Sequence, residues 1–177
     1  WYHSHYLSHE QVARGMVGPL IVEEVTPPDV DHDITAILAD WRMEEDGRLT
    51  DEFTDMHSVA HAGYMGNFAR AFLSQTSVRT GDRIRLRLIN TATNRIFPLT
   101  INGAQGMVVA LDGMPLAEPR ALDEVVLAPA QRADLIVDVT SRVSLEMLTR
   151  QGPYRLADIE INGTNTDRQE GQILPLT

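Results

Sequence analysis

The stretch that decides the fold runs Arg83-Ile84-Arg85-Leu86-Arg87-Leu88. Charged and apolar side chains alternate through it with a period of two, which is the period of a β-strand. The residues directly before it, 80–82, read Thr-Gly-Asp and are typical of a turn. We expect the three arginines to line a solvated strand face, so that they form no basic patch.

Similar short segments fill most of the chain. Residues 34–41 read as a largely buried strand that ends at Asp40-Trp41, and residues 50–75 read as irregular. Further strands are predicted at residues 97–101, 107–111, 124–127, 135–139 and 154–161, separated by glycines at 103, 106, 113 and 152. Many short strands without a long amphipathic helix indicate an all-β fold of the sandwich type.

The beginning of the chain carries a histidine pair, in the order Trp1-Tyr2-His3-Ser4-His5. Residues i and i+2 of a strand lie on the same face, roughly 6.7 Å apart along it, so His3 and His5 can point the same way. Two imidazoles placed like this can hold one metal ion, or one each of a close metal pair, and imidazole suits copper, zinc, iron and nickel. By itself the pattern is weak, because a lone His-x-His is more often structural or at the surface.

The surrounding residues make the pattern more specific. After the histidine pair and a short connector, in which residues 9–14 could form one helical turn, the chain continues Gly15-Met16-Val17-Gly18-Pro19-Leu20-Ile21-Val22. Later markers are Asp40-Trp41, Gly66-Asn67, residues 81–90, Asp112-Gly113 and residues 127–134. Together these stretches closely resemble the end of the first domain and the second domain of multicopper oxidases, the laccase-like enzymes.

The resemblance implies a cupredoxin-like Greek-key β-sandwich. It divides the chain into the end of a first cupredoxin domain (1–25), a second cupredoxin-like domain (26–170) and a linker toward a missing third domain (171–177). The two prolines at 27 and 28 would interrupt a helix or a strand ladder at the first boundary.

The resemblance also implies a copper cofactor. His3 and His5 would bind the type 3 copper pair of a trinuclear cluster, whose other ligands would lie outside this chain. The second domain would carry no copper, and residues 100–105 contain no histidine where copper-bearing domains of the fold place one. The partners would be dioxygen, a small-molecule or metal-ion reductant, and the missing cupredoxin domains, in a periplasmic or secreted location.

Composition excludes several other classes of function. The formal net charge of −10 argues against a nucleic-acid partner, because phosphate binding needs clustered Lys and Arg. The absence of cysteine rules out a disulfide, a cysteine nucleophile and a blue-copper centre within this chain. No apolar run is long enough to span a bilayer.

The remaining candidates have ordinary interpretations. We expect His9 and His32 to be exposed, and Asp82, Asp112 and Asp134 to have turn and edge roles. His57 and His61 are four residues apart and could chelate copper on a helix, but the residues around them give little indication of a helix, so we expect no metal role. Met56 and Met65 lie nearby and could bind Cu(I), since thioethers suit it, but packing is the more frequent role of methionine.

Two classes of function therefore remain. The first is a fragment of a copper oxidase that couples one-electron oxidation of a phenol or metal ion to the four-electron reduction of dioxygen. The second is a copper-free cupredoxin-like structural or binding protein, against which the retention of both His3 and His5 speaks. A copper nitrite reductase is a weaker third possibility. A His-x-His upstream and a His-Cys-His downstream would establish the oxidase, although residues 1–177 alone are expected to be inactive.

Overall fold

The structure is a computed structural model that describes residues 1–53, 65–168 and 171–176. Strand β6 (Arg83–Asn90) lies inside the larger sheet, where it pairs in parallel with β3 (His32–Trp41) and antiparallel with β10 (Arg132–Thr149). The apolar side chains that alternate along β6 are at most 1% exposed. The period of two therefore predicts this central strand correctly.

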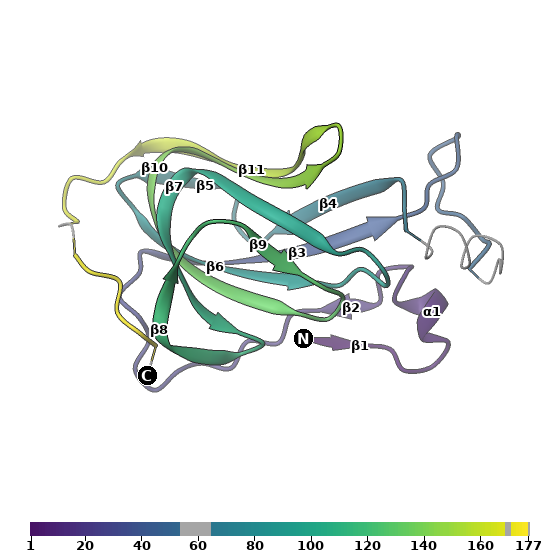
Figure 1. The fold of residues 1–177 in the computed structure, drawn as a ribbon, viewed down its shortest axis with the longest axis horizontal. Helices are drawn as coiled ribbons and strands as arrows, with labels where there is room; N and C mark the ends of the chain where they lie inside the picture. The colour runs from purple at the N-terminus through teal and green to yellow at the C-terminus, as the bar shows by residue number, and fades with distance from the viewer. Residues whose placement is uncertain (54–64, 169–170, 177) are drawn as a thin grey trace.

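Two long strands connect the two layers of the sandwich (Figure 1). The first half of β10 pairs with β6 and with the second half of β7 (Phe97–Leu111), whereas its second half pairs with the first half of β7 and with β11 (Gly152–Thr164). Because β7 and β10 each contribute to both layers, the strands enclose one core. The result is the predicted all-β Greek-key sandwich.

Shorter strands complete the layers. The first layer has β4 (Phe68–Leu73) at its edge beside β3, while β5 (Ser77–Thr80) runs parallel to β11 in the second. Strands β8 (Met114–Ala121) and β9 (Val125–Leu127) both pair antiparallel with β7.

The prediction of separate strands at 97–101 and 107–111 is wrong, because β7 continues through both glycines. Gly103 has φ +81° beside a register shift, so it allows a bulge in the strand. A Cβ at Gly106 would collide with the carbonyl oxygen of Ile136. These glycines therefore permit bending and close approach rather than ending the strand.

The prediction that residues 50–75 are irregular is wrong for β4. Ala69 and Ala71 face the core, while Arg70 and Phe72 are exposed. The alternation was hard to see because alanine is a small residue with low strand propensity. Strand β8 was missed for a different reason: its two prolines are tolerated only because it lies at a sheet edge.

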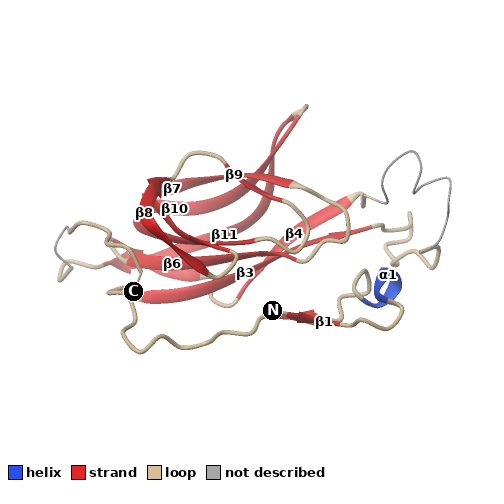
Figure 2. Ribbon diagram, turned by 60° about the horizontal axis from the view of Figure 1, so that its bottom comes forward, coloured by secondary structure: helices blue, strands red, loops and turns tan. Residues whose placement is uncertain are grey.

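The beginning of the chain forms a separate two-stranded sheet. Strand β1 (Tyr2–His3) pairs antiparallel with β2 (Val17–Gly18), and helix α1 (Ser8–Gln11) lies in the connection. Figure 2 shows β1 and α1 beside the sandwich rather than within its layers. Gly18 leaves room for the ring of Tyr2, which a Cβ at this position would hit.

The expectation of a solvated arginine face on β6 is wrong. Arg83 and Arg85 are only 6% and 2% exposed. Carboxylates from β10, from the start of β3 and from the chain that enters the sandwich cover the guanidinium groups. Sequence alternation showed that the arginines share one face, but could not show that acidic residues far away in the chain lie over it.

Candidate metal centre

The histidine pair lies at the end of strand β1. The rings of His3 and His5 are stacked, with centroids 4.7 Å apart and planes inclined by 22°. Trp1 lies on the other side of His3, with its ring centroid 4.8 Å away. The i, i+2 spacing therefore places both imidazoles on one side of the chain, as expected, although the regular strand ends at His3.

Ser4 points into the turn that follows and organises it. Its hydroxyl donates to the carbonyl oxygen of Tyr6 at 3.1 Å and accepts from the Tyr6 amide at 3.2 Å. Its single proton is shared with Oε1 of Gln11 at the end of α1. These contacts connect the residue between the two histidines to the helix, and so restrict the backbone that carries both rings.

The hydrogen bonding of His3 suits metal ligation. Its Nδ1 lies 3.0 Å from the backbone carbonyl oxygen of Ser4, which can only accept, so Nδ1 carries the proton of the neutral ring. The lone pair is then on Nε2. A ring N–H held by a backbone carbonyl is a frequent arrangement in histidines that bind metal, because it fixes the tautomer and the ring orientation. The residues present therefore fit part of an imidazole site for copper.

Two histidines do not complete such a site. Among the residues that the structure describes, no group of three or more His, Cys, Asp or Glu side chains is placed to hold a metal ion. His9 is exposed on α1, as expected. The proposed extra ligands His57, His61 and Met56 lie outside the described residues, and Met65 is 49% exposed.

His32 was expected to be exposed, but it is partly buried and hydrogen-bonded on both nitrogens. Its Nε2 donates to Asp82 at 3.2 Å, and its Nδ1 accepts from the amide of Gln75 at 3.2 Å. The pairing of β3 with β6 brings these residues together, which explains why the polar sequence around His32 was misleading. The histidine has a structural role in this arrangement.

Asp82, Asp112 and Asp134 have different partners in the fold. Asp82 lies in the turn before β6, and Asp112 caps the turn after β7 by accepting from the Arg132 amide at 2.9 Å. Asp134 is on β10 and binds Arg85. The predicted turn roles of Asp82 and Asp112 are confirmed, whereas Asp134 belongs to a buried ion pair.

Burial also shifts the pKa of Asp40, which the sequence marked only as a strand end and as part of the family resemblance. Asp40, at the end of β3, accepts from the Gly66 amide at 2.7 Å and lies 2.9 Å from Nε of Arg95. Burial raises the pKa of the Asp40 carboxyl, and the hydrogen bond from Gly66 and the charge of Arg95 oppose that increase. The pairing holds the end of β3 against the chain that follows β6.

The arrangement of strands in this Greek-key sandwich is that of the cupredoxin fold. The multicopper oxidase family model matches residues 33–166, and the chain belongs to the multicopper oxidase family. Copper cofactors are characteristic of that family.

Solved structures support the same classification. The chain is 51% identical to Lac15 from a marine microbial metagenome, with a TM-score of 0.87, over 100% of this chain and 44% of that one. It is 34% identical to a multi-copper oxidase from Pseudomonas thermotolerans, with a TM-score of 0.85, over 100% of this chain and 43% of that one.

Curated relatives are laccases. Laccase-1 of Fomitopsis schrenkii is 29% identical over 150 residues, which are 81% of this chain and 28% of the laccase. The chain thus spans less than half the length of these relatives. Among the described residues, no helix is both long and apolar enough to cross a membrane.

Proposed function

We propose that this chain is part of a longer laccase-like oxidase, in which His3 and His5 each bind one copper ion of the type 3 pair. The observation that carries the proposal is the stacked histidine pair, in which Nδ1 of His3 is held by a backbone carbonyl and Nε2 is left as the ligand atom. The family membership of the chain supports copper as the metal.

The proposed reaction takes four electrons, one at a time, from a phenol or a metal ion. Dioxygen accepts these electrons together with four protons and becomes two waters. Copper would supply the electron storage and the dioxygen binding. The chain itself would contribute the spacing and orientation of two imidazoles, which Trp1 and the Ser4 turn restrain.

The other ligands and the electron-accepting copper site would come from further cupredoxin domains. Two facts support this part of the proposal: the chain contains no cysteine, and it spans 44% of Lac15. We propose the division into the end of a first domain (1–25), a second domain (26–170) and a linker (171–177) on the same basis. A periplasmic or secreted location accords with the resemblance to laccases.

The first test is a native mass spectrum of the protein isolated from its source. We expect a chain heavier than 19.7 kDa that carries about four coppers, as a trinuclear cluster plus one electron-accepting site requires. A copper-free protein would contradict the proposal and favour the structural alternative.

The second test uses substitutions in the same protein. His3→Ala or His5→Ala should remove copper and abolish oxygen consumption, because each takes away a ligand, while the circular dichroism spectrum remains that of a β-sandwich. His9→Ala is the matched control, since His9 is exposed on α1 and is not part of the stacked pair. Full copper content and turnover in His3→Ala and His5→Ala would refute the ligand assignment.

A further inference from the structure

The three arginines on one face of β6 form an ion-pair ladder. Their side chains are only 7%, 3% and 13% exposed. Arg83 binds both oxygens of Asp138 at 2.6 and 2.8 Å, and Arg87 binds both oxygens of Asp33 at 2.7 Å. Each strand neighbour of β6 thus supplies a carboxylate that pairs with the ladder in two-point fashion.

The middle arginine of the ladder, Arg85, also pairs with a residue outside the sandwich. Arg85 donates to Asp134 on β10 through Nη2 at 2.6 Å and Nε at 3.1 Å, and its Nη1 lies 2.7 Å from both carboxylate oxygens of Glu24. Arg87 lies 3.8 Å from the same carboxylate. Glu24 belongs to the segment that carries the histidine pair, so this contact joins that segment to the centre of the sheet.

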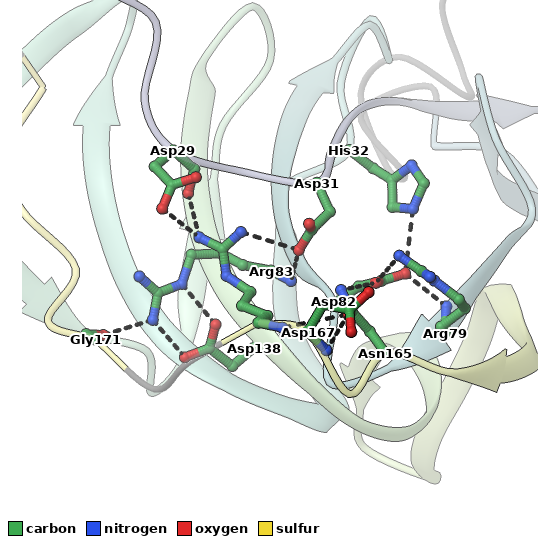
Figure 3. A network of polar contacts seen from close by, with 11 residues as sticks. Asp29, Asp31, His32, Arg79, Asp82, Arg83, Asp138, Asn165, Asp167 and Gly171 are labelled. Atoms are coloured by element: carbon green, nitrogen blue, oxygen red, sulfur yellow. Dashed lines mark hydrogen bonds and ion pairs between the residues drawn. The ribbon is translucent and has the colours of Figure 1, made fainter.

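The same ladder also holds the other end of the chain. Arg83 donates to the carbonyl oxygen of Gly171 at 2.6 Å (Figure 3). Nearby, Arg168 binds Asp29 and Asp31 at 2.9 and 3.1 Å. In Figure 1 the C-terminal tail passes close to the segment that enters the sandwich. A cavity of about 280 Å³ lies between Glu24–Asp29 and residues 172–176. The ladder therefore contacts both the segment that enters the sandwich, through Glu24, and the segment that leaves it, through Gly171.

Stability alone does not explain these charges. Desolvation offsets most of the attraction in a buried ion pair, and apolar residues of the same volume are often as stabilising. What a two-point arginine–carboxylate contact adds is a fixed geometry. Positioning the chain segments is therefore the property that the ladder supplies and an apolar strand would not.

We propose that the Glu24–Arg85 ion pair positions the histidine-bearing segment on the sandwich. Val17, the hairpin partner of His3, lies seven residues before Glu24. The Glu24–Arg85 ion pair therefore fixes the chain no more than about 23 Å of extended backbone away from the position of His3. Without this ion pair, the next residue toward the C-terminus that forms an ion pair with the sandwich is Asp29, twelve residues from Val17. An exposed contact, Arg14 with Asp51, also joins the segment to the remainder and is weak because Asp51 is 83% exposed.

The test measures the position of the segment directly, without copper. Because the chain contains no cysteine, His9→Cys on α1 and Glu118→Cys on β8 give a unique pair of spin-label sites, both exposed. We expect a narrow distance distribution by double electron–electron resonance, which Glu24→Gln broadens at least twofold. Glu24→Asp should restore much of the narrow distribution because it keeps the charge.

Glu23→Gln is the matched control, since it removes the same charge from the exposed neighbouring residue and should leave the width unchanged. In the Glu24→Gln variant Arg85 still forms its ion pair with Asp134. The urea concentration at the midpoint of unfolding should therefore equal that of the Glu23→Gln control. Equal widths in Glu24→Gln and Glu23→Gln would overturn the proposal.

The consequence for copper rests on the proposed function. In the isolated copper protein, lengthening the tether from seven to twelve residues lowers the local concentration of the histidines about twofold, so Glu24→Gln should weaken copper retention by a similar factor. If the distances broaden while His3→Ala leaves copper content unchanged, the positioning stands and the ligand assignment fails. If the distances do not broaden, the positioning fails whatever the copper content.

Discussion

Asp82 offers a sharp test of how the turn before β6 is held. Its side chain is fully buried, and donors surround both carboxylate oxygens. One oxygen accepts from the Arg79 amide at 2.7 Å and from His32 at 3.2 Å. The other accepts from Asn165 at 2.8 Å and lies 3.1 Å from the Arg79 guanidinium. We predict that Asp82→Asn is strongly destabilising, because one of its two positions becomes an NH₂ group that faces donors.

The magnitude follows from the contacts that are lost. Asparagine keeps a single acceptor oxygen, so at least two of the four contacts disappear and two donors face another donor. Hydrogen bonds to a charged group contribute about 1.5–3 kcal/mol each. We therefore expect Asp82→Asn to reduce the free energy of unfolding by about 3 kcal/mol at pH 7, as measured by urea denaturation. Asp123→Asn, at an exposed aspartate, should leave the midpoint unchanged.

The difference should also depend on pH. Burial tends to raise the pKa of Asp82, but hydrogen bonds from the Arg79 amide, Asn165, the Arg79 side chain and His32 outweigh it and lower the pKa. A lowered carboxyl pKa adds stability that is present above the unfolded pKa of about 3.9 and is lost as the pH falls through the folded pKa. The gap between the parent and Asp82→Asn should narrow in acid, below about pH 4. Two results would refute the reasoning. The first is a free energy of unfolding for Asp82→Asn within about 0.5 kcal/mol of that for Asp123→Asn. The second is a difference between the parent and Asp82→Asn that stays constant from pH 7 to pH 3.

Two further predictions concern packing and close approach. Leu135→Ala should lower the free energy of unfolding, measured by urea denaturation, by about 2–5 kcal/mol, because Leu135 is 0% exposed in the core. Val126→Ala, at a residue that is 53% exposed, should lower it by less than about 0.5 kcal/mol. Equal losses in the two variants would contradict the core assignment. Gly106→Ala should lower the midpoint of thermal unfolding, because its methyl group would meet the backbone of β10 at Ile136. Gly171→Ala should leave the midpoint unchanged, because no atom lies within 4 Å of the added methyl group. An unchanged midpoint in Gly106→Ala would show that β7 and β10 are farther apart than in this structure.

Local patterns in the sequence were sufficient for the fold class and for the histidine pair. The alternation at 83–88 predicted the central strand because side-chain direction in a strand depends only on the parity of the position. The same parity placed the rings of His3 and His5 side by side. The extents of β7 and β10 were not predictable, because whether Gly103 ends a strand or forms a bulge depends on the partner strand opposite it.

What the sequence by itself determined is therefore the strand pattern, the class of fold and the placement of the histidine pair that we propose binds copper, since all three follow from the order and chemistry of neighbouring residues. Only the tertiary structure decided the surroundings of the charged groups. Arg85 meets Asp134 and Glu24, which are 49 and 61 residues away in the chain, and His32 meets Asp82, which is 50 residues away. Such contacts depend on strand order and register, and these are set by the packing of the whole sandwich rather than by any local stretch.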